Sequence, residues 1–181
     1  MKCGCLVLLA GVAACAGAPL ASSNVPVMVV PSPPGLPGFG GRFAGTLRIH
    51  GERLREVPMG LDVLPSADGV GWSWRLRYGE GEAADVRDYR LLVDDASNGR
   101  YRIDEQNGIV LHARAVGDEL VSVFTVSGQT LCVRYRAVPD GIEFALESFD
   151  GSRSEATGQG VTTVAAMAAQ RALLRRLVGA P

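Results

Sequence analysis

The chain has 181 residues, of which 47% are hydrophobic and 20% charged, with 18 basic and 19 acidic side chains. This length predicts one domain, and the low charged fraction excludes a coil held open by self-repulsion. A formal net charge of −1 excludes attraction of the whole chain to nucleic acid, so no nucleic-acid partner is expected.

Residues 1–14 have the pattern of an export signal. Lys2 supplies one positive charge, and the uncharged apolar run 6–14 is too short to span a bilayer core, which needs about 20 residues. Val12-Ala13-Ala14-Cys15 resembles the lipobox of bacterial lipoprotein signals. That resemblance implies cleavage before Cys15 and acylation of its sulfur and its new amine. Because Ala16 rather than Asp follows, it also implies an outer-membrane location. An ordinary secretory signal and a buried core helix are the alternatives.

The acyl chains on Cys15 would be the membrane partner of this protein, since two chains on one residue give stable anchoring. Cys3 and Cys5 leave with the signal, so only Cys132 remains in the exported part. No internal disulfide is therefore expected, and the fold must be held by its core.

Residues 15–41 are predicted to be the lipidated cysteine and a tether. The stretch after Cys15 contains six of the ten prolines and no charged residue. Frequent proline prevents helix and favours extended chain. The tether lifts a domain off the bilayer or is an unselected connector, and its apolar run 25–30 can instead pair with a sheet edge or lie on the folded domain.

Residues 42–151 are predicted to form a β domain. Turn-forming pairs such as Asn98-Gly99, Asn107-Gly108 and Asp140-Gly141 recur, with spacings of 9, 10, 10, 13 and 10 residues from position 98 onward. Between them apolar and polar residues alternate, which gives about nine strands. Such a meander favours an up-and-down barrel of about 8–10 strands over a sandwich, with room for a small ligand inside.

Residues 152–181 are predicted to be a polar link followed by a helix packed on the barrel. The segment 161–178 is rich in Ala, Leu, Gln and Arg, which are strong helix formers. Arg171 and Arg175 interrupt its apolar stripe. A final strand near residues 161–168, which completes the barrel, is therefore the alternative.

Candidate ligand-binding residues lie on two neighbouring strands. Trp72, Trp74, Leu76 and Tyr78 share one face, where they line a cavity or fill the core. Arg87 and Tyr89 also share a face and suit a carboxylate. Three arginine pairs (75 and 77, 100 and 102, 134 and 136) are expected on the outer surface. The acidic pairs 94–95 and 104–105 are expected to be solvated in turns.

Three segments, at residues 71–75, 87–91 and 104–111, resemble landmarks of an uncharacterised bacterial envelope lipoprotein family with a lipocalin-like, calycin-type β-barrel. The resemblance implies the barrel and leaves the ligand open. Neither a catalytic constellation nor a metal-ligand pattern is present, so no enzyme, cofactor or metal site is predicted. His50 and His112 remain as alternative haem ligands. The expected function is a lipid-anchored envelope protein that binds a small apolar or amphipathic ligand. The alternative is an envelope scaffold or protein-interaction module with a packed barrel.

Overall fold

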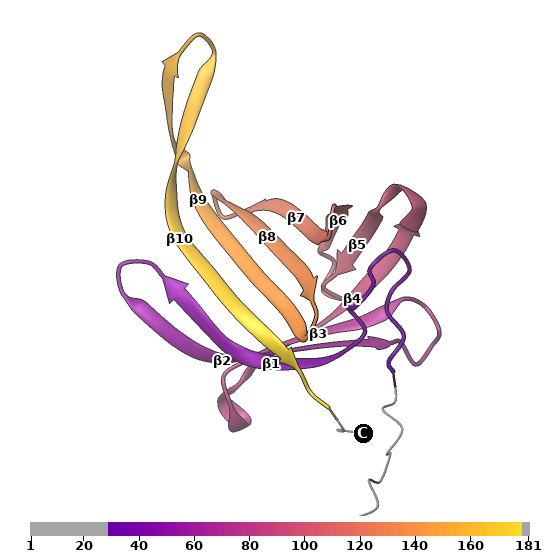
Figure 1. The fold of residues 1–181 in the computed structure, drawn as a ribbon. Coiled ribbons are helices and arrows are strands. Elements are labelled where there is room, and N and C mark those ends of the chain that lie inside the picture. Colours follow the sequence, from indigo (N-terminus) through magenta and orange to yellow (C-terminus); the bar gives the residue numbers. More distant parts are fainter. Residues whose placement is uncertain (1–28, 179–181) are drawn as a thin grey trace, which may run out of the picture.

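The computed structural model describes residues 29–178, which form ten antiparallel strands in up-and-down order (Figure 1). Because β1 pairs with β10 as well as with β2, the sheet closes and has no free edge along the barrel wall. The predicted up-and-down barrel of 8–10 strands is thus confirmed. The elements, in order, are β1 (Gly41–His50), β2 (Leu54–Pro65), β3 (Trp72–Tyr78), η1 (Gly81–Ala83), β4 (Asp85–Asp95), η2 (Ala96–Asn98), β5 (Arg100–Asp104), β6 (Val110–Val116), β7 (Glu119–Val126), β8 (Gln129–Val138), β9 (Gly141–Gly158) and β10 (Val161–Arg176).

Alternation along the strands separates the core from the surface. In β3, Trp74 and Leu76 are buried while Arg75 and Arg77 are exposed. Five of the six arginines predicted on the outer surface pair with an acidic side chain, namely Arg75, Arg100, Arg102, Arg134 and Arg136. Each of three strand-borne arginines pairs with an acid: Arg75 with Asp88, Arg102 with Asp94, and Arg136 with Glu143.

The predicted C-terminal helix is wrong, and the alternative of a final strand fits. β10 alternates Ala172 and Leu174 inward with Arg171 and Arg175 outward. Its antiparallel pairing with both β9 and β1 satisfies its backbone groups and closes the barrel. Barrel closure therefore outweighs the helix propensity of this alanine-rich segment. Most residue types differ in helix propensity by less than about 0.7 kcal/mol per residue.

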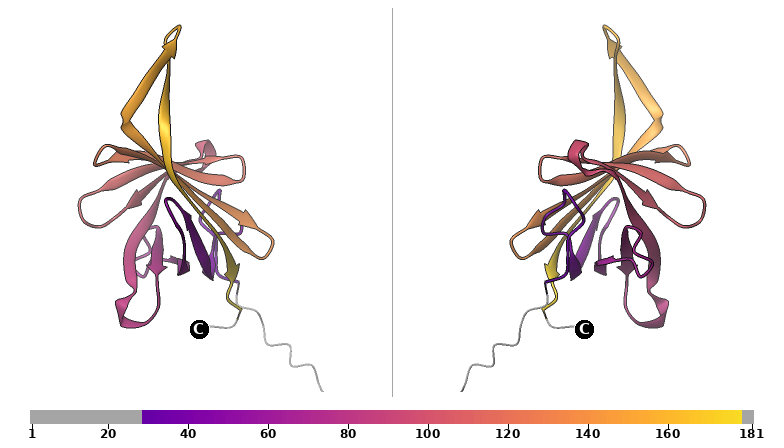
Figure 2. Two further views of the ribbon diagram at one scale, coloured as in Figure 1. Left: turned by 90° about the vertical axis from the view of Figure 1, so that its left-hand side faces the viewer. Right: turned by 90° about the vertical axis from the view of Figure 1, so that its right-hand side faces the viewer.

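The outer parts of β9 and β10 form an arm that projects beyond the barrel (Figure 2). Consecutive positive φ angles at Gln159 (51°) and Gly160 (78°) turn the chain tightly at its tip. The segment predicted as a polar link after residue 151 therefore forms the outer part of β9 and the turn at the tip of the arm. Val161 and Val164 are at least half exposed there.

The two ends of the barrel differ. At the closed end, where β1 begins and β10 ends, residues 31–40 fold across the opening as a plug. Leu36 and Phe39 of the plug are buried. Tyr101 donates a hydrogen bond from its hydroxyl to the Pro34 carbonyl, at 2.7 Å. This part of the predicted tether therefore packs against the barrel. The arm projects from the opposite, open end (Figure 1).

Arg176 fastens the plug to the barrel wall. Its guanidinium donates hydrogen bonds to the carbonyls of Gly40 and Gly38 and lies 4.6 Å from the centre of the Phe43 ring. We expect Arg176→Gln to lower the free energy of unfolding by about 2 kcal/mol, because two hydrogen bonds to a charged donor are lost. Arg175→Gln is the control, since Arg175 points outward toward Asp140 at 3.4 Å. Urea denaturation would contradict this role of Arg176 if both variants lost equally little stability.

Within residues 29–178, no helix has the length and apolar character needed to cross a membrane.

Candidate functional site

A cavity of about 490 Å³, called the cup here, occupies the open half of the barrel. Tyr78 at the end of β3, Ile109 before β6 and Val126 at the end of β7 lie at its rim, so the cup opens at the end opposite the plug. Most of its lining is aliphatic or aromatic. The lining residues are Trp74, Leu76, Tyr78, Arg87, Tyr89, Ile103, Glu105, Ile109, Leu111, Ser122, Phe124, Thr125, Val126, Leu131, Val133, Tyr135, Phe144 and Leu146.

Three packed aromatic rings form the floor of the cup. Tyr135 stands edge-on to Trp74, with ring centres 4.9 Å apart, and lies 5.2 Å from Phe144. Trp74 also stacks at 6.1 Å on Phe39 of the plug, so the floor and the plug form one continuous core. The Trp74 indole N–H is buried and makes no hydrogen bond to any group of residues 29–178. The floor therefore separates the cup from the closed end.

The rim carries an ion pair on an aromatic ring. Arg87 donates from Nε and Nη2 to one oxygen of Asp85, at 3.1 and 2.9 Å, and its guanidinium lies 5.1 Å from the centre of the Tyr78 ring. Register explains this position. Arg87 pairs with Leu76, whose side chain points inward, so the Arg87 side chain also lies on the inner face.

Glu105 lies on the same rim. It follows β5 directly, and because Arg90 pairs with Asp104, Glu105 comes beside Tyr89 on the inner face. Burial raises the pKa of Tyr89, and the negative charge of Glu105 raises it further. The prediction of a solvated turn is wrong for Glu105, since its side chain is half-buried and lines the cup.

Five of the six predicted ligand-binding residues line the cup, namely Trp74, Leu76, Tyr78, Arg87 and Tyr89. Trp72 faces inward but packs against the core nearer the closed end. Sequence reasoning missed the opposite wall, which β6–β9 supply. The alternating pattern could have identified this wall, because one residue of each strand lies at an apolar, inward-facing position. These residues are Leu111, Phe124, Leu131 and Leu146.

The other singled-out residues lie outside the cup. His50 ends β1 and is exposed, and His112 pairs with Arg102 on the outer face. Cys132 pairs with Glu147 on the outer face, half-buried. Among residues 29–178, no group of three or more His, Cys, Asp or Glu side chains is placed to hold a metal ion. Cys15 and the predicted signal lie outside the described residues.

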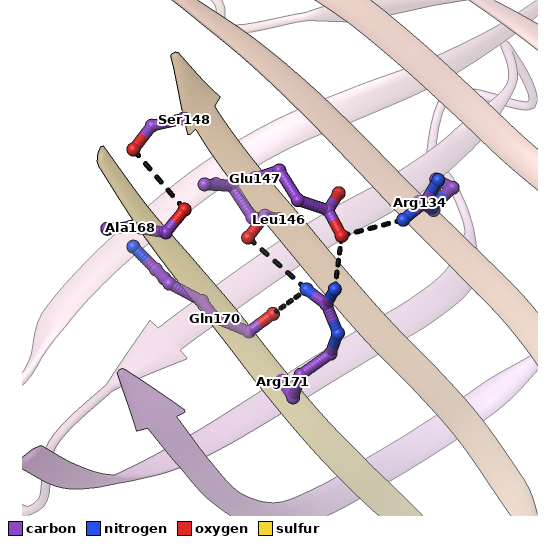
Figure 3. A network of polar contacts seen from close by, with 7 residues as sticks. All are labelled: Arg134, Leu146, Glu147, Ser148, Ala168, Gln170 and Arg171. Atoms are coloured by element: carbon purple, nitrogen blue, oxygen red, sulfur yellow. Dashed lines mark hydrogen bonds and ion pairs between the residues drawn. The ribbon is translucent and has the colours of Figure 1, made fainter. Parts of the chain in front are cut away.

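A second hollow, on the outer face of β7–β10 and β1, is strongly charged. Glu147 accepts from both Arg134 and Arg171, and Arg171 also donates to the carbonyls of Leu146 and Gln170 (Figure 3). Arg136 is held by Glu143 in the same way. Because these arginines are already engaged by carboxylates on the barrel wall, the cup is the better candidate for a ligand site.

A comparison with protein-family models found no match to this chain, and no curated protein is detectably similar to it.

The tyrosines around the cup predict a stability change at alkaline pH. Burial raises the pKa of Tyr78 to about 12, against a weaker opposing effect of Arg87, and burial raises the pKa of Tyr135 further. A free tyrosine titrates near 10. The stability contributed by neutral Tyr78 is therefore complete below pH 10 and is lost as the pH rises to about 12.

Absorbance at 295 nm reports tyrosine ionisation directly. All four tyrosines have raised pKa values in the fold. At pH 10.5 we expect the native chain to show much less tyrosinate than the same chain in concentrated urea. Equal tyrosinate in the two samples would contradict the burial of these rings.

Proposed function

We propose that this chain is a lipid-anchored protein of the bacterial envelope whose barrel binds a small apolar or amphipathic ligand in the cup. The observation that supports ligand binding most strongly is the cup itself. Its volume of about 490 Å³ lies within the range of roughly 300–1,000 Å³ that is typical of small-molecule pockets. An apolar wall with a few polar groups at one end is also the usual lining of such pockets.

The asymmetry of the barrel supports a binding role over a purely packed one. The closed half is filled by Trp74, Phe39 and Leu36, which supply stability. In the open half, Ile109 and Val126 remain 49% exposed although they border an apolar hollow. A ligand that covered these side chains would remove apolar surface from water, at about 25 cal/mol per Å².

The position of the plug suggests how the anchor and the cup are related. The plug lies immediately before β1, and within it Ser32 accepts a hydrogen bond from the Gly40 amide at 3.0 Å. The 15 residues from Cys15 to Val29 can span at most ~50 Å. The proposed anchor thus leads to the closed end, and the cup opens at the other end of the barrel.

A second candidate function is that of a protein-interaction module, and the arm favours it. Val161, Val164 and Met167 are 56%, 50% and 47% exposed on a hairpin that the barrel does not cover. An exposed apolar segment of this kind is typical of a contact surface.

Mass spectrometry of the chain purified from bacterial membranes tests both parts of the leading proposal. Intact mass should correspond to a chain that begins at Cys15 and carries acyl groups, and an unmodified or differently cleaved N-terminus would refute the anchor. Organic extraction of the Cys15→Ser chain should release one apolar or amphipathic compound in about equimolar amount. Clean extracts from several preparations would refute a resident ligand.

A further inference from the structure

Two charged side chains line the cup, Arg87 and Glu105, and only one of them is neutralised by a side chain of opposite charge. Arg87 is paired with Asp85 through two hydrogen bonds to the same carboxylate oxygen. Its guanidinium also lies over Tyr78, whose ring face is electron-rich. The positive charge of Arg87 is therefore already compensated by Asp85 and by the Tyr78 ring.

Glu105 has no cationic partner among residues 29–178. The one side chain that hydrogen-bonds to it is Asn107, whose amide donates to Glu105 at 3.3 Å. The carboxylate is half-buried and borders Tyr89 and the apolar wall. Counting Asp85, Arg87 and Glu105 together, the rim of the cup carries one uncompensated negative charge.

The chemistry of this rim favours a positive group over a negative one. An ammonium group can donate to Glu105 and to the Tyr89 hydroxyl, and the electron-rich face of the Tyr89 ring attracts cations. A carboxylate or phosphate would instead face the charge of Glu105 and compete with Asp85 for Arg87. Charge repulsion and the loss of an existing pair would both weaken its binding.

We propose that the ligand of the cup is a cationic amphiphile, with an amine or ammonium group held at the rim by Glu105 and an apolar part lying between Phe124, Leu131 and Leu146. This inference rests on the proposed ligand-binding function and specifies the class of ligand. The aromatic floor at Trp74 limits the depth that the apolar part reaches.

Three probes with the same chain length separate charge from apolar burial. Decylammonium, decanol and decanoate are titrated by calorimetry, at pH 7 and below their micelle concentrations, into the full chain carrying Cys15→Ser. We expect decylammonium to bind about fivefold more tightly than decanol, the gain typical of a partly exposed ion pair, and decanoate to bind most weakly.

Two cup variants and one matched control test the role of Glu105. Glu105→Gln should remove the preference for decylammonium over decanol, because it weakens decylammonium binding much more than decanol binding. Arg87→Gln should increase that preference, so the two variants move in opposite directions, which a general loss of structure cannot reproduce. Glu155→Gln removes the same charge from the exposed arm and should change nothing.

Each outcome distinguishes this inference from the function on which it rests. If decanol binds but decanoate binds more tightly than decylammonium, or if Glu105→Gln leaves the order of affinities unchanged, the cationic class is wrong and the ligand-binding function stands. If none of the three probes binds, both are overturned.

Discussion

Replacing Trp74 by alanine is expected to lower the free energy of unfolding by about 3–5 kcal/mol. The Trp74 side chain is fully buried in the floor of the cup, where it contacts Tyr135 on one side and Phe39 of the plug on the other. Its removal leaves a void that the surrounding strands cannot collapse to fill, because their hydrogen-bonded ladders hold them in place. Urea denaturation followed by circular dichroism measures the loss.

Two further variants make the Trp74 prediction specific. Trp72→Ala should cost clearly less, because Trp72 faces the same side of β3 but is only half-buried. Trp74→Phe should also be milder than Trp74→Ala, because it keeps a ring in place and the lost indole N–H has no acceptor in the described part of the chain. If Trp72→Ala were as destabilising as Trp74→Ala, Trp74 would not be the centre of the core.

Filling the cup with Leu131→Trp is expected to weaken the binding of decanol at least tenfold while the barrel stays folded. Leu131 lies in β8, where it pairs with Phe124 of β7 and Ser148 of β9, and its side chain borders the cup. A larger ring there occupies space that the ligand needs. Because that space is open, the substitution should avoid most of the cost of overpacking, which is about 1–3 kcal/mol in a filled core.

Leu173→Trp is the matched control for the filled cup. Leu173 lies on the outer face of β10 and is 40% exposed, so the same substitution leaves the cavity unchanged. Calorimetric titration of the Cys15→Ser chain carrying either variant gives the comparison. Equal decanol affinity in both would place the binding outside the cup.

Much of the fold was predictable because strands in a barrel leave a direct pattern in the sequence. Turn pairs such as Asn107-Gly108 indicate where the chain reverses between strands. The alternation of apolar and polar residues around Trp74 and Tyr135 shows which side chains face inward and which face outward. Closure was also predictable, since a long meander has few other ways to avoid exposed edges.

The C-terminal strand was harder to predict because local and long-range preferences conflict there. The residues 164–174 favour helix when considered alone. Pairing with β9 along this whole segment, and with β1, which is more than 100 residues away in sequence, makes them a strand. The alternation of Ala172 and Leu174 with Arg171 and Arg175 was the available signal. It was weak because alanine fits either face.

The candidate site was predictable in part. The inner face of β3 and β4 was identified from Trp74, Tyr78 and Arg87, but whether that face borders a cavity depends on how deep the plug and the aromatic floor lie. Alternation within a strand contains no information about that depth. Glu105 was missed because acidic residues in turns are usually solvated, and only the register between β4 and β5 places it inside the rim.

The most direct test of a ligand in the cup is the set of nuclear Overhauser contacts between decanol and the methyl groups of the Cys15→Ser chain. The proposed function predicts contacts to cup residues Ile109, Val126 and Leu131. Contacts restricted to Val161 and Val164 on the exposed arm would show that amphiphiles adsorb to the arm instead and would contradict binding in the cup.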